Sequence, residues 1–138
     1  MSVVELAGAA GKNANPESRM ASSVSPRSYL SDDPVLACRT SVILVADALR
    51  VPVEEIVAGA RGSARSARAR QAAMYLAHVA LGISLTAVGR FFGRDHSTVA
   101  HGCHRVEDRR DHPDFDALIA ELALAARIAL NLDREIAA

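Results

Sequence analysis

The sequence predicts an all-α fold, a compact bundle of about six helices that includes a helix-turn-helix. Half of its 138 residues are apolar, but aromatic residues make up only 4% and Trp is absent. The core must therefore consist mainly of Ala, Leu, Val and Ile, and Ala-rich apolar stretches favour closely packed helices over sheet. Two short helical patterns joined at Gly93 indicate the helix-turn-helix. We expect one domain over residues 32–138.

Residues 1–31 differ in composition from the rest, being rich in Ala, Ser, Gly, Asn and Pro with little apolar periodicity. Such a segment cannot bury enough apolar surface to offset the entropy lost on ordering, so we predict a disordered, mobile N-terminal tail. No apolar run is long enough to cross a bilayer, and Cys38 and Cys103 are too few for a disulfide framework. The sequence therefore predicts a cytoplasmic protein.

The first predicted helix begins near Asp33 and Pro34, because Asp can cap a helix and Pro suits the first turn. It runs through VLACRTSVILVADALR, where apolar residues form a broad stripe, and ends before Pro52. A second, short helix follows in VPVEEIVAG, with acidic residues in its first turn and Gly59 as its stop.

Residues 60–71, ARGSARSARARQ, predict a basic loop that leads into a buried helix over residues 72–82. Such a loop can follow a nucleic-acid backbone or enter a minor groove, or it can be a flexible connector with solvated charges. Arg70 and Gln71 fall at the expected start of the buried helix. Basic residues there are locally unfavourable unless an external anion is bound.

A pair of short helices is predicted next. Ser84 is the expected N-cap of a supporting helix over residues 85–92, and Gly93 permits a sharp turn after it. The second helix opens at Asp95 or His96 and continues through STVAHGCHRVEDRR. Two short helices joined by a tight turn that contains Gly make a helix-turn-helix.

The first turn of this second helix is markedly polar. Its backbone N–H groups are unpaired and the helix dipole favours anions there, which suits phosphate. Short side chains that donate and accept hydrogen bonds suit base edges in a major groove. These side chains are Asp95, His96, Ser97 and Thr98. We therefore predict that the helix recognises duplex nucleic acid.

Charge is distributed unevenly along the chain, although the formal net charge is zero. Residues 61–113 hold nine Arg against four acidic residues, a balance of +5, and all five His. The remainder holds seven basic against twelve acidic residues, a balance of −5. This asymmetry indicates that one segment meets a polyanion, although a solvated arginine-rich surface has the same composition.

A last helix is predicted after Pro113, over residues 114–131, with the tail LDREIAA as an extension. Its apolar coverage is broad. Leu124, Ile128 and Leu132 are expected either to face outwards, leaving a surface for a protein partner or for self-association, or to belong to an ordinary core.

Two chemical alternatives use the same polar segment. His96, His101, Cys103 and His104 are zinc-ligand types, but their spacing matches no paired finger and does not place them on one helix face. A nuclease built on Asp95 and His96 lacks a second carboxylate cluster for metal-assisted chemistry. Base recognition uses all four polar residues, so we expect no metal, no cofactor and no enzymatic activity.

The motif order over residues 45–122 is a basic loop, RxRQ, an apolar helix and SLxxVGxxFGRDHSTVxHxxxxV. This order resembles the C-terminal DNA-binding domain of the bacterial chromosomal replication initiator DnaA. The most specific part of the resemblance is GRDHSTVAHGCHRV. It implies a sequence-specific binder of double-stranded DNA, whose target in the family is a short asymmetric site, the DnaA box.

The resemblance also implies roles for individual residues. Recognition of base edges is implied for Asp95, His96, Ser97 and Thr98. Contact with the sugar-phosphate backbone is implied for Arg70, Gln71, His78, Leu85, Thr86, His101 and Arg105, where His78 replaces the family's usual Lys. The family's minor-groove Arg falls at or near Gly62, and Arg61 or Arg65 is expected to replace it.

Two further departures from the family bear on function. The turn before RDH is one Gly shorter than the family's FGGRDH, which predicts a slightly different position for the second helix. The sequence has no GxxxxGK[ST] motif and Lys12 is its only Lys, so ATP hydrolysis by an AAA+ module is not expected.

The expected function is binding at DnaA-box-like sites on the nucleoid, which regulates replication initiation or transcription without ATPase activity. The alternative is a protein-interaction adaptor that kept the fold and lost DNA binding. The neutral net charge and Gly62 at the minor-groove position are consistent with that alternative.

Overall fold

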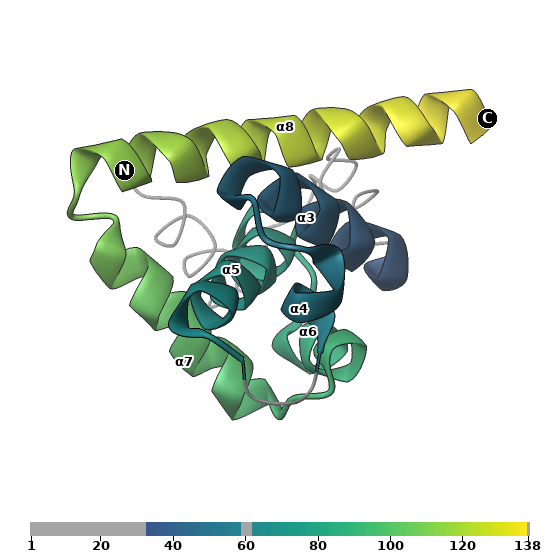
Figure 1. The fold of residues 1–138 in the computed structure, drawn as a ribbon. Coiled ribbons are helices and arrows are strands. Elements are labelled where there is room, and N and C mark those ends of the chain that lie inside the picture. Colours follow the sequence, from purple (N-terminus) through teal and green to yellow (C-terminus); the bar gives the residue numbers. More distant parts are fainter. Residues whose placement is uncertain (1–32, 59–61, 138) are drawn as a thin grey trace, which may run out of the picture.

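The computed structural model describes residues 33–58 and 62–137, and these ranges contain helices and no strand (Figure 1). The predicted all-α fold is therefore confirmed. The predicted tail, residues 1–31, lies outside the described residues, as do the Gly59 stop and Arg61.

Helix α3, Pro34–Leu49, begins where the sequence predicts. The Asp33 carboxylate caps it by accepting a hydrogen bond from the Leu36 N–H at 3.0 Å, and the proline occupies the first turn, where its missing N–H costs nothing. The helix ends at Arg50, which has a left-handed φ of 57°. The chain then turns into the short helix α4, Val53–Val57.

Helix α5, Ala64–Tyr75, begins earlier than predicted, and the expected basic loop is wrong for most of its length. The Ser63 hydroxyl caps this helix by accepting a hydrogen bond from the Ser66 N–H at 3.0 Å. Ala and Arg both have high helix propensity, so the capped run continues into the apolar segment without a break. Arg70 and Gln71 therefore lie in the middle of a helix and not at its N-terminus.

The same axis continues as η1, Leu76–Ala80, where the backbone widens into a π-helix. The Leu81 N–H donates to the Leu76 carbonyl, five residues back, at 3.0 Å. Gly82, with a φ of 76°, follows and turns the chain towards α6.

Three further helices complete the bundle: α6, Leu85–Phe92; α7, His96–Arg109; and α8, Pro113–Ala137. Helix α5 packs against α3 and α7, α6 packs against α7, and α8 lies along α3 and η1 (Figure 1). The predicted helix-turn-helix is the pair α6 and α7, with bounds that differ from the prediction by one residue. Helix α8 includes most of the tail that was expected to extend it.

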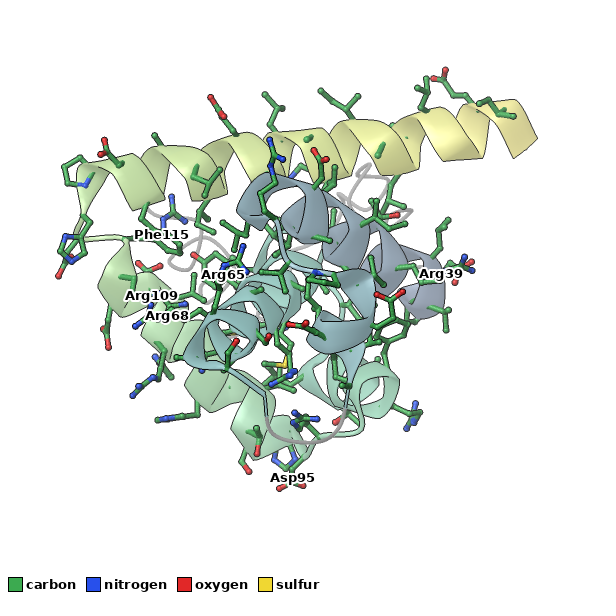
Figure 2. All side chains as sticks on the ribbon, viewed as in Figure 1. Arg39, Arg65, Arg68, Asp95, Arg109 and Phe115 are labelled. Atoms are coloured by element: carbon green, nitrogen blue, oxygen red, sulfur yellow. The ribbon has the colours of Figure 1, made fainter. Side chains whose placement is uncertain are left out.

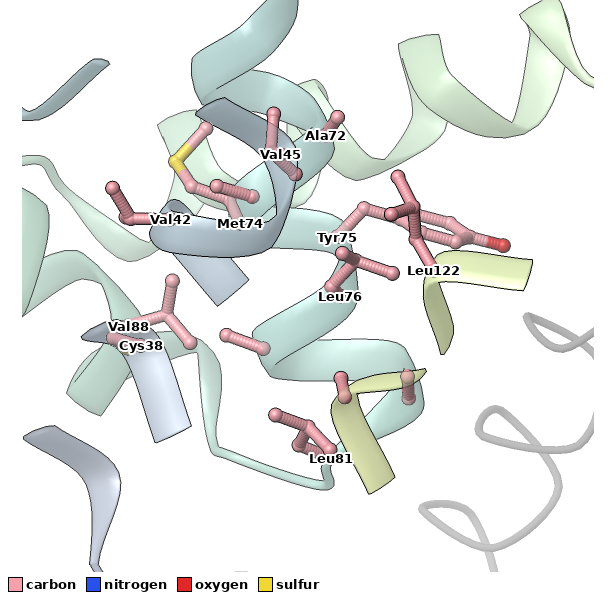
Figure 3. Packing of buried hydrophobic residues seen from close by; sticks show 14 of the residues in the cluster. Cys38, Val42, Val45, Ala72, Met74, Tyr75, Leu76, Leu81, Val88 and Leu122 are labelled. Carbon is pink, nitrogen blue, oxygen red and sulfur yellow. The ribbon is translucent and has the colours of Figure 1, made fainter. Parts of the chain in front are cut away.

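The core forms around α5 and η1, which confirms the predicted buried central helix. Figure 3 shows Tyr75, Leu76 and Leu81 packed among side chains of α3 and α8. Cys38 and Cys103 are buried free thiols, and burial raises the pKa of each to about 12. Both thiols therefore stay protonated at neutral pH and pack as small apolar groups.

Four side chains hold the corner between α7 and α8. The Tyr75 hydroxyl donates to the Glu107 carboxylate and accepts from Arg110 Nη1, both at 2.9 Å. Arg110 Nε makes an ion pair with Asp116 in the first turn of α8. Burial raises the pKa of Tyr75, so the hydroxyl keeps the proton that it donates. This network sets the direction in which α8 leaves α7.

The outer face of α8 carries a row of apolar side chains that are each more than half exposed: Leu124, Ile128, Leu132 and Ile136. Of the two alternatives left open for Leu124, Ile128 and Leu132, an outward-facing surface or an ordinary core, the structure shows the outward-facing one. They recur every four residues, so they form one stripe along the helix. Within residues 33–58 and 62–137, no helix has both the length and the hydropathy needed to cross a membrane.

Candidate nucleic-acid interface

A tight turn connects α6 to α7 and sets the angle between them. Gly93 has a φ of 68°, and the N–H groups of Gly93 and Arg94 both donate to the Gly89 carbonyl, the latter at 2.8 Å. Gly89 is buried, and a Cβ there would lie 2.4 Å from the Arg94 carbonyl oxygen. The close approach of the backbone at Gly89 thus fixes how α7 leaves α6.

The predicted base-recognising residues Asp95, His96, Ser97 and Thr98 lie together at the start of α7, and all four side chains are exposed. Asp95 is the N-cap residue, yet its side chain makes no hydrogen bond to the backbone of the first turn. Its Oδ2 accepts instead from the Ser97 hydroxyl at 3.1 Å. Figure 2 shows Asp95 at an outer tip of the bundle. This tip, residues 95–98, presents hydrogen-bonding groups and the positive end of a helix dipole to solvent.

The opposite face of α7 is buried. Val99, Cys103 and Val106 recur at helical spacing on this face, and each is at most 8% exposed. Gly102 brings α7 close to α5, since a Cβ there would lie 3.0 Å from the Met74 methyl carbon. One face of α7 is therefore packed against the core, while its N-terminal end, residues 95–98, extends into solvent.

The predicted backbone contacts divide into outer and inner residues. Thr86, His101 and Arg105 are exposed, whereas Gln71 and Leu85 are partly buried. His101 and Arg105 are one turn apart on α7 and extend its outward edge beyond the tip. Contact with DNA stays a prediction for each of these residues.

Arg70 is an inner residue, only 8% exposed, and its guanidinium is hydrogen-bonded within the protein. Its Nε donates to the Ile56 carbonyl at 2.9 Å and its Nη2 to the Glu55 carbonyl at 3.1 Å. Both carbonyls belong to α4, whose last carbonyl groups have no partner within the helix. Arg70 therefore joins α5 to α4, and a contact with phosphate would have to replace these bonds.

We expect Arg70→Ala to lower the free energy of unfolding by about 2–6 kcal/mol, because two carbonyl groups lose their donors and each loss costs roughly 1–3 kcal/mol. Urea denaturation followed by circular dichroism measures this change. The matched control is Arg68→Ala, an exposed position two residues earlier on the same helix, with an expected change within about 0.5 kcal/mol. Equal changes in the two variants would contradict the structural role.

Arg65 does not lie at the tip. Its Nη2 donates to the carbonyls of Leu49 and Arg50 at the end of α3, and Figure 2 shows it well apart from Asp95. A minor-groove contact by Arg65 would require the side chain to leave these carbonyls. The expected replacement at Arg61 lies outside the described residues.

His78 is half-buried on η1, and its Nδ1 lies 2.7 Å from the Ile83 carbonyl oxygen. A carbonyl oxygen only accepts, so Nδ1 carries a proton and Nε2 of the neutral ring is an acceptor. His78 can therefore donate to a phosphate through Nε2 only as the imidazolium ion.

Two arginines that the sequence pattern left unassigned, Arg68 and Arg109, lie close enough to repel each other, and Arg109 also lies near Arg105. Arg68 is exposed on α5, and Arg109 is partly buried at the end of α7. Arg109 Nη1 donates to Gln71 Oε1 at 3.2 Å, and the guanidinium carbon lies 5.3 Å from the centre of the Phe115 ring. Arg109 follows Arg105 by four residues, about one helical turn, and this spacing is the sequence signal that would have identified Arg109.

The described residues include no group of three or more His, Cys, Asp or Glu side chains placed to hold a metal ion. Cys103 faces the core, whereas His96, His101 and His104 are exposed. The surface is instead suited to hydrogen bonding at the tip of α7 and to charge along its edge.

The same region matches known proteins. Residues 42–106 match the family model for the bacterial DnaA protein helix-turn-helix. The chain is similar to the chromosomal replication initiator protein DnaA of Acinetobacter baumannii (strain AYE), with 41% identity over 91 residues, and to that of Lachnoclostridium phytofermentans, with 50% identity over 52 residues. These matches cover 59% and 36% of this chain, but only 19% and 12% of the two relatives.

A solved structure has a similar fold. The crystal structure of a DNA replication initiation factor aligns with a TM-score of 0.62 and 32% sequence identity, covering 70% of this chain and 30% of that chain. The chain thus spans less than a third of the length of these relatives. The residues that match the family model include α6, the turn after it and α7 as far as Val106.

Proposed function

We propose that this chain, whose residues 42–106 match the family model for the bacterial DnaA helix-turn-helix, binds double-stranded DNA sequence-specifically at DnaA-box-like sites. The relatives are named as replication initiators, and the family model that matches residues 42–106 is that of the bacterial DnaA protein helix-turn-helix. The proposed action is binding without a catalytic step.

The observation that carries the proposal is the exposed tip of α7. Four side chains with hydrogen-bond donors and acceptors project from the first turn of a helix that is anchored on its other face. A single helix fits the major groove of B-form DNA, and the side chains at its N-terminal end then meet base edges. Asp95, His96, Ser97 and Thr98 are the proposed base-recognising residues.

Affinity and specificity come from different parts of this surface. The proposed backbone contacts at His101 and Arg105, with Thr86 on α6, position the duplex but carry no sequence information. Arginine contacts with phosphate release counterions, so affinity falls as salt rises. Discrimination between sequences then depends on the tip.

We further propose that the chain regulates replication initiation or transcription by occupying sites that the initiator recognises. A binder that shares the initiator's recognition helix competes with it for the same base edges. Such a protein acts on the nucleoid.

The alternative function, a protein-interaction adaptor that kept the fold and lost DNA binding, is favoured by one observation. The outer face of α8 exposes a stripe of four apolar side chains, and exposed apolar surface of this kind often contacts another protein.

Titration of two fluorescently labelled duplexes separates the two functions. One carries a DnaA box and the other the same bases scrambled, each at about 0.05 M and 0.2 M salt. We expect the boxed duplex to bind roughly a thousandfold or more tightly than the scrambled one. Equal affinities for the two duplexes would exclude sequence-specific binding. Binding to neither would favour the adaptor.

A further inference from the structure

Three arginines lie at the edge where α5 packs against α7, and Arg109 is near each of the other two, Arg68 and Arg105. Arg68 and Arg105 are exposed, and Arg109 lies partly buried near both. We call this set the arginine edge. Figure 2 shows Arg68 and Arg109 near each other and Arg39 on the far side of the bundle. The edge follows α7 away from its tip.

Arg109 is held in place by neutral groups. Its Nη1 donates to Gln71 Oε1 at 3.2 Å, and its guanidinium carbon lies 5.3 Å from the centre of the Phe115 ring. Its Nη2 atom is buried and finds no hydrogen-bond acceptor among the described residues. A buried donor without an acceptor is costly, and a charged one more so. The Arg109 side chain is thus held in one orientation in the free protein, although one of its N–H groups lacks a hydrogen-bond acceptor.

The charge of the arginine edge is not neutralised within the described ranges. Burial lowers the pKa of Arg109, and repulsion from Arg68 and then from Arg105 lowers it further. No ion pair joins Arg68, Arg105 or Arg109 to a carboxylate in the part of the chain that the structure describes, and two acidic residues of this corner have other partners: Glu107 accepts from Tyr75, and Asp116 pairs with Arg110. Like charges gathered without a counter-charge destabilise the free protein, and an external anion removes that cost.

We propose that the arginine edge binds the phosphate backbone of duplex DNA beyond the groove that α7 enters. Arg68 and Arg105 contact phosphate oxygens directly. Arg109 is a positioning residue, because it stands behind them as a fixed charge that Gln71 and Phe115 hold in orientation. The inference deepens the proposed function and rests on it, since it needs a duplex seated on α7. It adds Arg68 and Arg109 to the residues that recognise DNA.

The test measures the slope of log affinity against log salt concentration for boxed and scrambled duplexes. Loss of one phosphate contact lowers the steepness of this slope by about 0.9 on B-form DNA, so we expect that change for Arg68→Ala. The affinity should fall by a similar factor for both duplexes, because phosphate contacts carry no sequence information. Arg39→Ala, an exposed arginine on α3, is the matched control and should keep the wild-type slope.

Arg109 requires two variants because it also packs on Phe115. Arg109→Met keeps an unbranched side chain but removes the charge, and Arg109→Lys keeps the charge. We expect the Met variant to bind both duplexes more weakly with a shallower salt slope, and the Lys variant to recover most of that slope. A Met variant that melts at a lower temperature but keeps the wild-type slope would overturn the positioning role.

Failure of this inference differs from failure of the proposed function. If the wild-type protein prefers the boxed duplex but Arg68→Ala and Arg109→Met keep its salt slope, the arginine edge is refuted and sequence-specific binding stands. If the wild-type protein binds both duplexes equally and these variants make the slope shallower, the arginine edge stands and specificity is refuted. If the protein binds no duplex, both are refuted.

Discussion

Gly89→Ala is expected to remove sequence-specific DNA binding and to lower the free energy of unfolding by about 1–3 kcal/mol or more. The added Cβ would lie 2.4 Å from the Arg94 carbonyl oxygen, a distance at which backbone must move. That movement strains the hydrogen bond from the Arg94 N–H to the Gly89 carbonyl, which closes the turn. Helix α7 then leaves α6 at a different angle, and its tip no longer matches the groove.

Urea denaturation and titration of the boxed duplex measure the two effects of Gly89→Ala separately. The matched control is Gly93→Asn, in the same turn. Nothing lies within 4 Å of a Cβ at Gly93, and Asn tolerates its left-handed φ of 68° better than most residues. A Gly89→Ala protein as stable and as specific as the Gly93→Asn protein would show that the turn accommodates a side chain.

His96→Ala and Thr98→Ala are each expected to reduce discrimination between boxed and scrambled duplexes by about 1–3 kcal/mol, or roughly 5- to 150-fold. Both side chains are exposed at the tip of α7, so neither substitution should change the free energy of unfolding by more than about 0.5 kcal/mol. Affinity for the scrambled duplex should change little, because that binding depends on charge.

His104→Ala is the matched control, an exposed histidine two turns further along α7. It should keep the wild-type ratio of affinities. If His96→Ala and Thr98→Ala weakened both duplexes equally, the tip would contribute affinity but no discrimination, and the proposed base recognition would be wrong.

The parts of the fold that the sequence predicts well depend on interactions within one turn of helix. The caps at Asp33 and Ser84 and the left-handed Gly93 each act on residues at most four positions away. The polar first turn of α7 is equally local, and its exposure could be anticipated from the apolar spacing of Val99 and Val106 alone. The helix-turn-helix was therefore predictable almost to the residue.

The contacts that the sequence did not reveal join residues that lie far apart in the sequence. Arg70 reaches a carbonyl 14 residues away, and Arg109 reaches Gln71 at a separation of 38 residues, so no local pattern indicates that either side chain is held. The start of α5 was missed for a different reason. Ser63 stands among Gly, Ala and Arg residues that suit a loop as well as a capped helix.

The network at the corner of α7 and α8 has a geometric consequence. The far end of α7 is joined to the first turn of α8, a helix 25 residues long, by Tyr75, Glu107, Arg110 and Asp116. A helix of that length extends about 37 Å at 1.5 Å per residue. If α7 enters a groove of DNA, α8 would therefore have a fixed orientation relative to the duplex. Its apolar stripe would then lie at one defined position relative to the DNA axis.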